Sequence, residues 1–214
     1  DFMDLSPLGA QLLEELDITT AQFGLVVSAY AFSAGASGIL AAGFADRFDR
    51  KTLLLFFYAG FILGTFLCGI APTYFLLLMA RIVTGIFGGV IGSIVFAIIT
   101  DLFPLEMRGR VMGFVQMAFA VSQVLGLPVG LYFANLFDWH APFLLIVVLS
   151  IPIYILIFLR LKPINAHLAL QKDNSAFRHL WETISKPRYL QGFAGTILLA
   201  TGGFMLMPFG STFS

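Results

Sequence analysis

The chain has 214 residues, of which 59% are hydrophobic and only 11% are charged, and its formal net charge is zero. Because an average soluble domain carries about 25% charged residues, a chain this poor in charge could not cover its surface in water, and a lipid bilayer is its expected partner. The zero net charge argues against nucleic acid as a partner, and the lone cysteine, Cys68, excludes a disulfide framework within the chain.

Uncharged apolar runs long enough to cross a bilayer recur along the chain. A membrane-spanning helix needs about 20 apolar residues at a rise of about 1.5 Å per residue. The turn signal Ala71-Pro72-Thr73 divides one long run into two helices. The sequence therefore predicts an all-α membrane protein with spans at roughly 20–44, 52–70, 74–100, 111–136, 140–160 and 190–212.

The first residues predict one more helix, of which only the end is present. Glu14, Glu15 and Asp17 mark its exit from the lipid. The 13 residues before Glu14 would span about 20 Å as a helix, which is less than the hydrocarbon thickness of about 30 Å. We expect seven helices, with a membrane bundle over 1–160, a cytoplasmic linker with short amphipathic helices over 161–189, and helix seven over 190–214.

Basic residues indicate how the chain is oriented in the membrane. Eleven of the 12 Lys and Arg residues follow the second, fourth and sixth helices, whereas the alternate loops 16–20, 71–73 and 137–140 contain none. The positive-inside rule assigns the basic loops to the cytoplasm.

The twelfth basic residue, Arg81, lies within a predicted span, about 13 Å from the outer end of helix four. Such a charge is costly unless it faces a cavity or a partner. Asp1 and Asp4 share one face of the first helix, and Asp4 lies at a depth similar to that of Arg81. These three residues predict a proton-coupling site, with a permanent ion pair between helices as the structural alternative. Polar residues that could line a substrate cavity, or simply bond between helices, include Tyr30, Gln116, Gln123 and Asn135.

The segment 42–51, AGFADRFDRK, carries a recognisable pattern. It resembles G-x-L-A-D-R-x-G-R-K, which joins helices two and three in transporters of the major facilitator superfamily. The matching residues are Asp46, Arg47, Arg50 and Lys51. Ala42 and Asp49 stand where the family pattern has glycine.

Three further segments are similar to the same family. Residues 81–89 match the helix-four pattern R-x-x-x-G-x-x-x-G, with Gly85 and Gly89, and residues 101–110 fit the loop after helix four. The antiporter pattern G-x-x-x-G-P-x-x-G of helix five is matched in part by Gly126, Pro128 and Gly130, while Ser122 replaces its first glycine.

This resemblance implies a twelve-helix transporter of two six-helix bundles that works by alternating access around a central site. The chain would then be the first bundle plus helix seven, in a monomer of the bacterial inner membrane. Its expected partners are lipid, protons and a small-molecule substrate, with the proton gradient as the energy source and no cofactor. The predicted function is proton-coupled efflux of a drug-like or sugar-like solute. The alternatives are a sugar or organic-acid symporter and a membrane sensor that does not transport.

The charged loop residues predict a gate on the cytoplasmic side. Asp46 and Asp101 lie at the cytoplasmic ends of helices two and four and could pair with Arg50 or Arg108. The alternative is that the basic residues, such as Arg47 and Lys51, only orient the chain. The helix-packing candidates are the small or kinking residues Gly85, Gly89, Gly126, Pro128 and Gly130.

The residues that other function classes require are missing from the sequence. The three histidines have no metal-ligand spacing, so no metal site is expected. A phosphate-binding loop for ATP-driven transport is absent from the sequence, and so is the nucleophile arrangement of an enzyme.

Overall fold

The computed structural model describes residues 12–13, 15–42, 45–165, 190, 192, 194, 195 and 198. Its elements are α2 (Thr20–Ala42), the 3-10 turn η1 (Ala45–Arg47), α3 (Arg50–Cys68), α4 (Tyr74–Leu102), α5 (Leu105–Leu136) and α6 (Ala141–Arg160). All five α-helices are long and apolar enough to cross a membrane, and the described residues include no strand. The predicted helical membrane fold is therefore confirmed. Most residues of the predicted first and seventh helices lie outside the described set.

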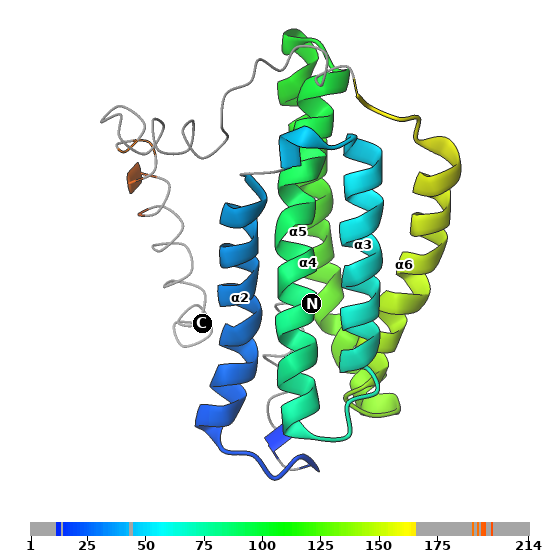
Figure 1. The fold of residues 1–214 in the computed structure, drawn as a ribbon. Coiled ribbons are helices and arrows are strands. Elements are labelled where there is room, and N and C mark those ends of the chain that lie inside the picture. Colours follow the sequence, from blue (N-terminus) through cyan, green and yellow to red (C-terminus); the bar gives the residue numbers. More distant parts are fainter. Residues whose placement is uncertain are drawn as a thin grey trace, which may run out of the picture. The chain divides into compact units, whose positions relative to one another are not determined.

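The chain divides into two compact units, 1–170 and 171–214, and the architecture below is that of the first. Within it, α4 lies between α2 and α3, and α6 packs on α3 (Figure 1). The helix boundaries agree with the predicted spans to within a few residues, except that α5 begins at Leu105 rather than at 111. Arg108 and Arg110 therefore belong to the first turns of α5 and not to a loop.

Polar side chains define where the helices begin. Thr19 and Gln22 form a reciprocal cap before α2: Gln22 Oε1 accepts the Thr19 N–H at 2.8 Å, and Thr19 Oγ1 accepts the Gln22 N–H at 3.3 Å. Thr73 caps α4 through the N–H of Leu76 at 3.4 Å. These caps satisfy N–H groups that a helix leaves without an internal partner.

Small residues let α4 approach both neighbours closely. A Cβ added at Gly85 would lie 2.6 Å from the carbonyl oxygen of Tyr30 on α2, and one at Gly89 would lie 2.6 Å from the Cα of Ala34. On the other side, a Cβ at Gly64 of α3 would lie 2.8 Å from the backbone nitrogen of Thr84. Backbone-to-backbone approach of this kind drives helix association in lipid, where the hydrophobic effect between helices is absent.

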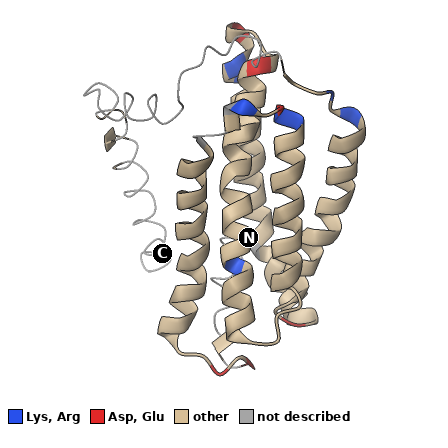
Figure 2. Ribbon diagram, viewed as in Figure 1, with Lys and Arg blue, Asp and Glu red and all other residues tan. Residues whose placement is uncertain are grey.

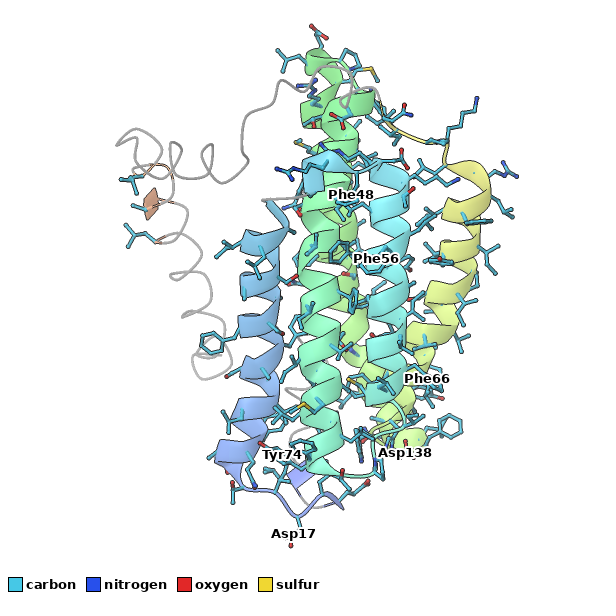
Figure 3. All side chains as sticks on the ribbon, viewed as in Figure 1. Asp17, Phe48, Phe56, Phe66, Tyr74 and Asp138 are labelled. Atoms are coloured by element: carbon cyan, nitrogen blue, oxygen red, sulfur yellow. The ribbon has the colours of Figure 1, made fainter. Side chains whose placement is uncertain are left out.

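The outer surface of the helices is apolar, with exposed side chains such as Phe32, Phe56 and Phe114. In water such a surface would be an aggregation hazard, but it suits contact with lipid. Lys and Arg gather instead at one end of the helices, which we call the basic end (Figure 2). Phe48 lies at this end, whereas Asp17, Tyr74 and Asp138 lie at the opposite end (Figure 3).

The close α2–α4 contact predicts a selective effect of a single methyl group. Gly89→Ala places a Cβ against the backbone of Ala34, so α2 must shift, and overpacking of this kind costs about 1–3 kcal/mol. We expect a lower melting temperature in detergent. Gly92→Ala on the same helix is the matched control, because a Cβ there meets nothing within 4 Å. Equal melting temperatures for the two variants would contradict the close contact between α2 and α4 at Gly89.

Candidate functional site

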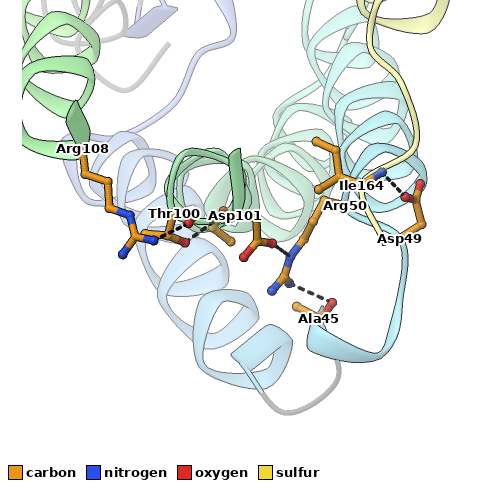
Figure 4. Close-up of polar contacts among 8 residues, drawn as sticks. Ala45, Asp49, Arg50, Thr100, Asp101, Arg108 and Ile164 are labelled. Carbon is orange, nitrogen blue, oxygen red and sulfur yellow. Dashed lines mark hydrogen bonds and ion pairs between the residues drawn. The ribbon is translucent and has the colours of Figure 1, made fainter. Parts of the chain in front are cut away.

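An ion pair joins α3 and α4 at the basic end. Arg50 Nε donates to Asp101 Oδ2 at 3.0 Å, and Arg50 Nη1 donates to the carbonyl oxygen of Ala45 at 3.2 Å (Figure 4). The two charged side chains are only 8% and 21% exposed. Because Arg50 is buried, loss of Asp101 would strand its charge, so this contact holds the start of α3 to the end of α4.

Arg108 has a different role from the one that its charge suggested. It lies in the first turn of α5 and donates from Nη2 to Thr100 O at 2.8 Å and from Nε to Phe103 O at 2.9 Å. These carbonyls belong to the last turn of α4 and its C-cap, where a cation is favourable. Of the two basic partners that the sequence offered for Asp101, the described contacts show Arg50 in the ion pair and Arg108 at the helix end.

The other gate candidates belong to η1 and to α3. Asp46 belongs to η1, but its side chain is outside the described set, and Arg47 is exposed. Lys51 Nζ donates to Phe158 O at 2.9 Å and lies 5.5 Å from the centre of the Phe158 ring, so it links α3 to the end of α6.

Sequence reasoning missed the role of Asp49, which caps α3. Its Oδ2 accepts from the N–H and the hydroxyl of Thr52, both at 2.9 Å, and its Oδ1 accepts the N–H of Ile164 at 2.6 Å. The sequence did contain a signal, which is the aspartate at position 49 where the family pattern has glycine. An aspartate directly before a helix is a preferred cap.

Within the membrane span, Arg81 is completely buried. Its guanidinium carbon lies 4.7 Å from the centre of the Tyr30 ring, so a cation–π contact joins α4 to α2. A desolvated contact of this kind contributes about 2 kcal/mol. Asp1 and Asp4, the predicted partners of Arg81, lie outside the described residues.

Two of the candidates on α5 border an apolar groove. Gly126 and Gly130 line it together with side chains from α3 and α6, and its volume is about 430 Å³. Gln123 is half-buried and Gln116 is exposed, while Pro128 lies inside α5 and is also exposed. Among the cavity candidates, the structure places Tyr30 against Arg81.

Comparison with known proteins places the chain in a family. The family model described as Major Facilitator Superfamily matches residues 2–214. The uncharacterized MFS-type transporter YceJ of Bacillus subtilis is 31% identical over 96% of this chain and 52% of its own length. The vacuolar membrane amino acid uptake transporter fnx2 of Schizosaccharomyces pombe is 36% identical over 65% of this chain, and multidrug resistance protein 3 of Bacillus subtilis is 36% identical over 56%.

The chain spans about half the length of YceJ and 23% of each of the other two proteins. The match nevertheless covers almost every residue of this chain, and the helical membrane architecture agrees with it. The chain therefore belongs to the Major Facilitator Superfamily.

Proposed function

We propose that this chain contributes the first bundle of a secondary transporter that exports a small organic solute in exchange for protons. The observation that carries the proposal is the complete burial of Arg81, a permanent cation, within the central helix α4. Charge inside a membrane is costly, and it marks substrate, ion or proton pathways. Export is supported by similar proteins that are named for multidrug resistance and, with 25% identity in Helicobacter pylori, as a probable sugar efflux transporter.

The proton would be carried by a carboxylate beside Arg81. Because Arg81 stays charged at any physiological pH, a partner acid is needed to gain and lose the proton, and Asp1 and Asp4 are the candidates. A solute that occupies the same cavity would then compete with the proton. Such competition couples export of the solute to entry of the proton.

The gate is the second part of the proposal. In this proposal the basic end faces the cytoplasm, as the positive-inside rule expects, and the membrane is the inner membrane of a bacterial cell. There the Arg50–Asp101 pair would hold the cytoplasmic side closed while the opposite side is open, with Asp46 and Arg47 of η1 as further gate candidates.

A second candidate function is import by symport. It is favoured by the similarity to a protein named for amino acid uptake, and it would use the same gate and the same buried Arg81. A sugar or organic acid is the corresponding substrate class. Direction of flux separates the two functions.

The function is tested with the complete protein in everted membrane vesicles under an imposed pH gradient. Ethidium, radiolabelled glucose and radiolabelled amino acids serve as probes, and vesicles without the protein serve as the control. We expect an acid interior to drive accumulation of at least one probe, and a protonophore to abolish it. Proton-driven accumulation in right-side-out vesicles would instead establish import. No flux of any probe in either orientation would contradict transport and favour the sensor alternative.

The same assay separates proton coupling from a structural ion pair. Asp4→Asn is expected to abolish proton-driven flux while probe binding persists without its pH dependence, because the titrating group is gone. The double variant Asp4→Asn, Arg81→Gln removes both charges. If the double variant restores stable, pH-dependent flux, the pair is only structural and Asp1 remains the candidate proton carrier.

The gate predicts a loss of turnover without a loss of binding. Asp101→Asn weakens the contact to Arg50 Nε, so the closed cytoplasmic end is less stable and the maximal flux falls about tenfold, which corresponds to about 1.4 kcal/mol. Probe affinity should stay within about twofold of the parent. Asp138→Asn is the matched control, since this exposed carboxylate lies at the opposite end. Unchanged flux in Asp101→Asn would contradict the proposed gate.

Orientation is tested with introduced cysteines and a membrane-impermeant maleimide on intact cells. Phe48 and Asp138 are both exposed and lie at opposite ends (Figure 3), whereas the native Cys68 is buried. We expect Asp138→Cys to be labelled from outside and Phe48→Cys only after the cells are opened. Labelling of position 48 in sealed cells would reverse the orientation.

A further inference from the structure

The chain that leaves α6 returns to the start of α3. Residues 161–165, which we call the strap, follow the last residue of α6, Arg160, and have no regular secondary structure. Ile164 in the strap is only 6% exposed, although both of its neighbours in sequence are exposed. The strap therefore packs against the bundle at this residue.

Two hydrogen bonds fix Ile164 to the N-terminus of α3. The Arg50 N–H donates to Ile164 O at 3.2 Å. The Ile164 N–H donates to Asp49 Oδ1 at 2.6 Å, as Figure 4 shows. Both polar groups of the Ile164 backbone are thus satisfied by two consecutive residues of one helix end. This geometry specifies one position of the strap, since a shift by one residue would break both bonds.

The carboxylate of Asp49 divides its two oxygens between two tasks. Oδ2 caps α3 through Thr52, and Oδ1 holds the strap. Capping alone needs one side-chain oxygen, which serine or threonine also provides. The second oxygen therefore has a use beyond the helix, and glycine, which the family pattern has at this position, could serve neither.

Arg50 connects the strap to the ion pair of the basic end. Its backbone N–H binds Ile164, while its side chain binds Asp101 of α4. Lys51, the next residue, binds the carbonyl of Phe158 in the last turn of α6. Three consecutive residues, the cap Asp49 and the first two residues of α3, thus hold the exit of α6 on one side and the end of α4 on the other.

We propose that the strap is a latch, docked on Asp49 and Arg50, that couples the start of the connection after α6 to the Arg50–Asp101 gate. When Asp101 releases Arg50, the α3 N-terminus is freed to move, and the strap loses the register on which both of its bonds depend. The docked strap in turn favours the closed gate. The latch itself depends only on the contacts above, whereas the coupling rests on the proposed gate.

The docking is tested by the reactivity of a cysteine in place of Ile164 in the complete protein. Ile164→Cys keeps the backbone bonds and puts a buried thiol in the strap, and the parent protein with its buried Cys68 is the control without a reporter. In everted vesicles we measure the rate of labelling by an impermeant maleimide. Adding Asp49→Ser keeps the cap of α3 but is too short to reach the strap as well, so the rate should rise about tenfold, as loss of one charge-assisted hydrogen bond predicts.

The matched control for α3 itself is Thr52→Ala, which removes one bond to Asp49 Oδ2 and leaves the bond to Ile164. It should label at the rate of the reporter protein, with a melting temperature close to that of Asp49→Ser. Equal labelling of the reporter protein and Asp49→Ser would overturn the latch. Faster labelling in Thr52→Ala, equal to that in Asp49→Ser, would also overturn it, because fraying of α3 would then explain both.

The coupling is tested by adding Asp101→Asn to the same reporter and measuring flux and labelling together. We expect flux to fall and labelling to rise several-fold, while Asp138→Asn changes neither. A fall in flux with unchanged labelling would overturn the coupling and leave the gate intact. Unchanged flux would overturn the gate and the coupling with it, whereas the latch is decided by the labelling of Asp49→Ser and its control Thr52→Ala.

Discussion

The close approach of α4 to both α2 and α3 is the constraint on which the described bundle depends. Lipid offers no hydrophobic gain when two apolar helices associate, so stability must come from close packing and a few polar contacts. Gly85 and Gly89 supply that approach toward α2, and Gly64 of α3 supplies it on the other side. The positions of the charged groups on α4 are set by these contacts.

Helix α4 carries two of the charged groups that the proposed cycle uses. Arg81 and Asp101 are twenty residues apart in sequence, which is about 30 Å along a helix. One is a buried cation within the span and the other is half of a gate at the basic end. Because a helix of this length moves largely as one body, a tilt of α4 against the glycine contacts would displace both groups together. Communication between cavity and gate then needs no continuous chain of charges.

The sequence predicted the helical elements well because length and apolar character are sufficient for a membrane span. It erred by six residues at the start of α5, where Pro104 directly precedes Leu105 and permits a helix to begin. The arginines there had suggested a loop, yet Arg108 finds its partners on the carbonyls at the end of α4. The sequence could not decide whether Arg50 or Arg108 pairs with Asp101, because both arginines were compatible with the spacing.

Contacts between distant positions were beyond sequence reasoning, and two of the departures from the family pattern, Ser122 and Asp49, show why. Ser122 replaces a glycine on α5, and its hydroxyl donates to Phe119 O of the same helix at 2.7 Å, so its polarity is satisfied locally. Asp49 also replaces a glycine, but it reaches a residue 115 positions away.

A carboxylate at the start of α3 is favoured locally by the helix dipole and by capping. Those local terms explain one oxygen of Asp49 and would allow serine equally well. The second oxygen is explained only by the strap, whose backbone N–H at Ile164 would otherwise be buried without this acceptor. The departure from glycine at position 49 therefore follows from the path of the chain after α6, which only the structure shows to return to the start of α3.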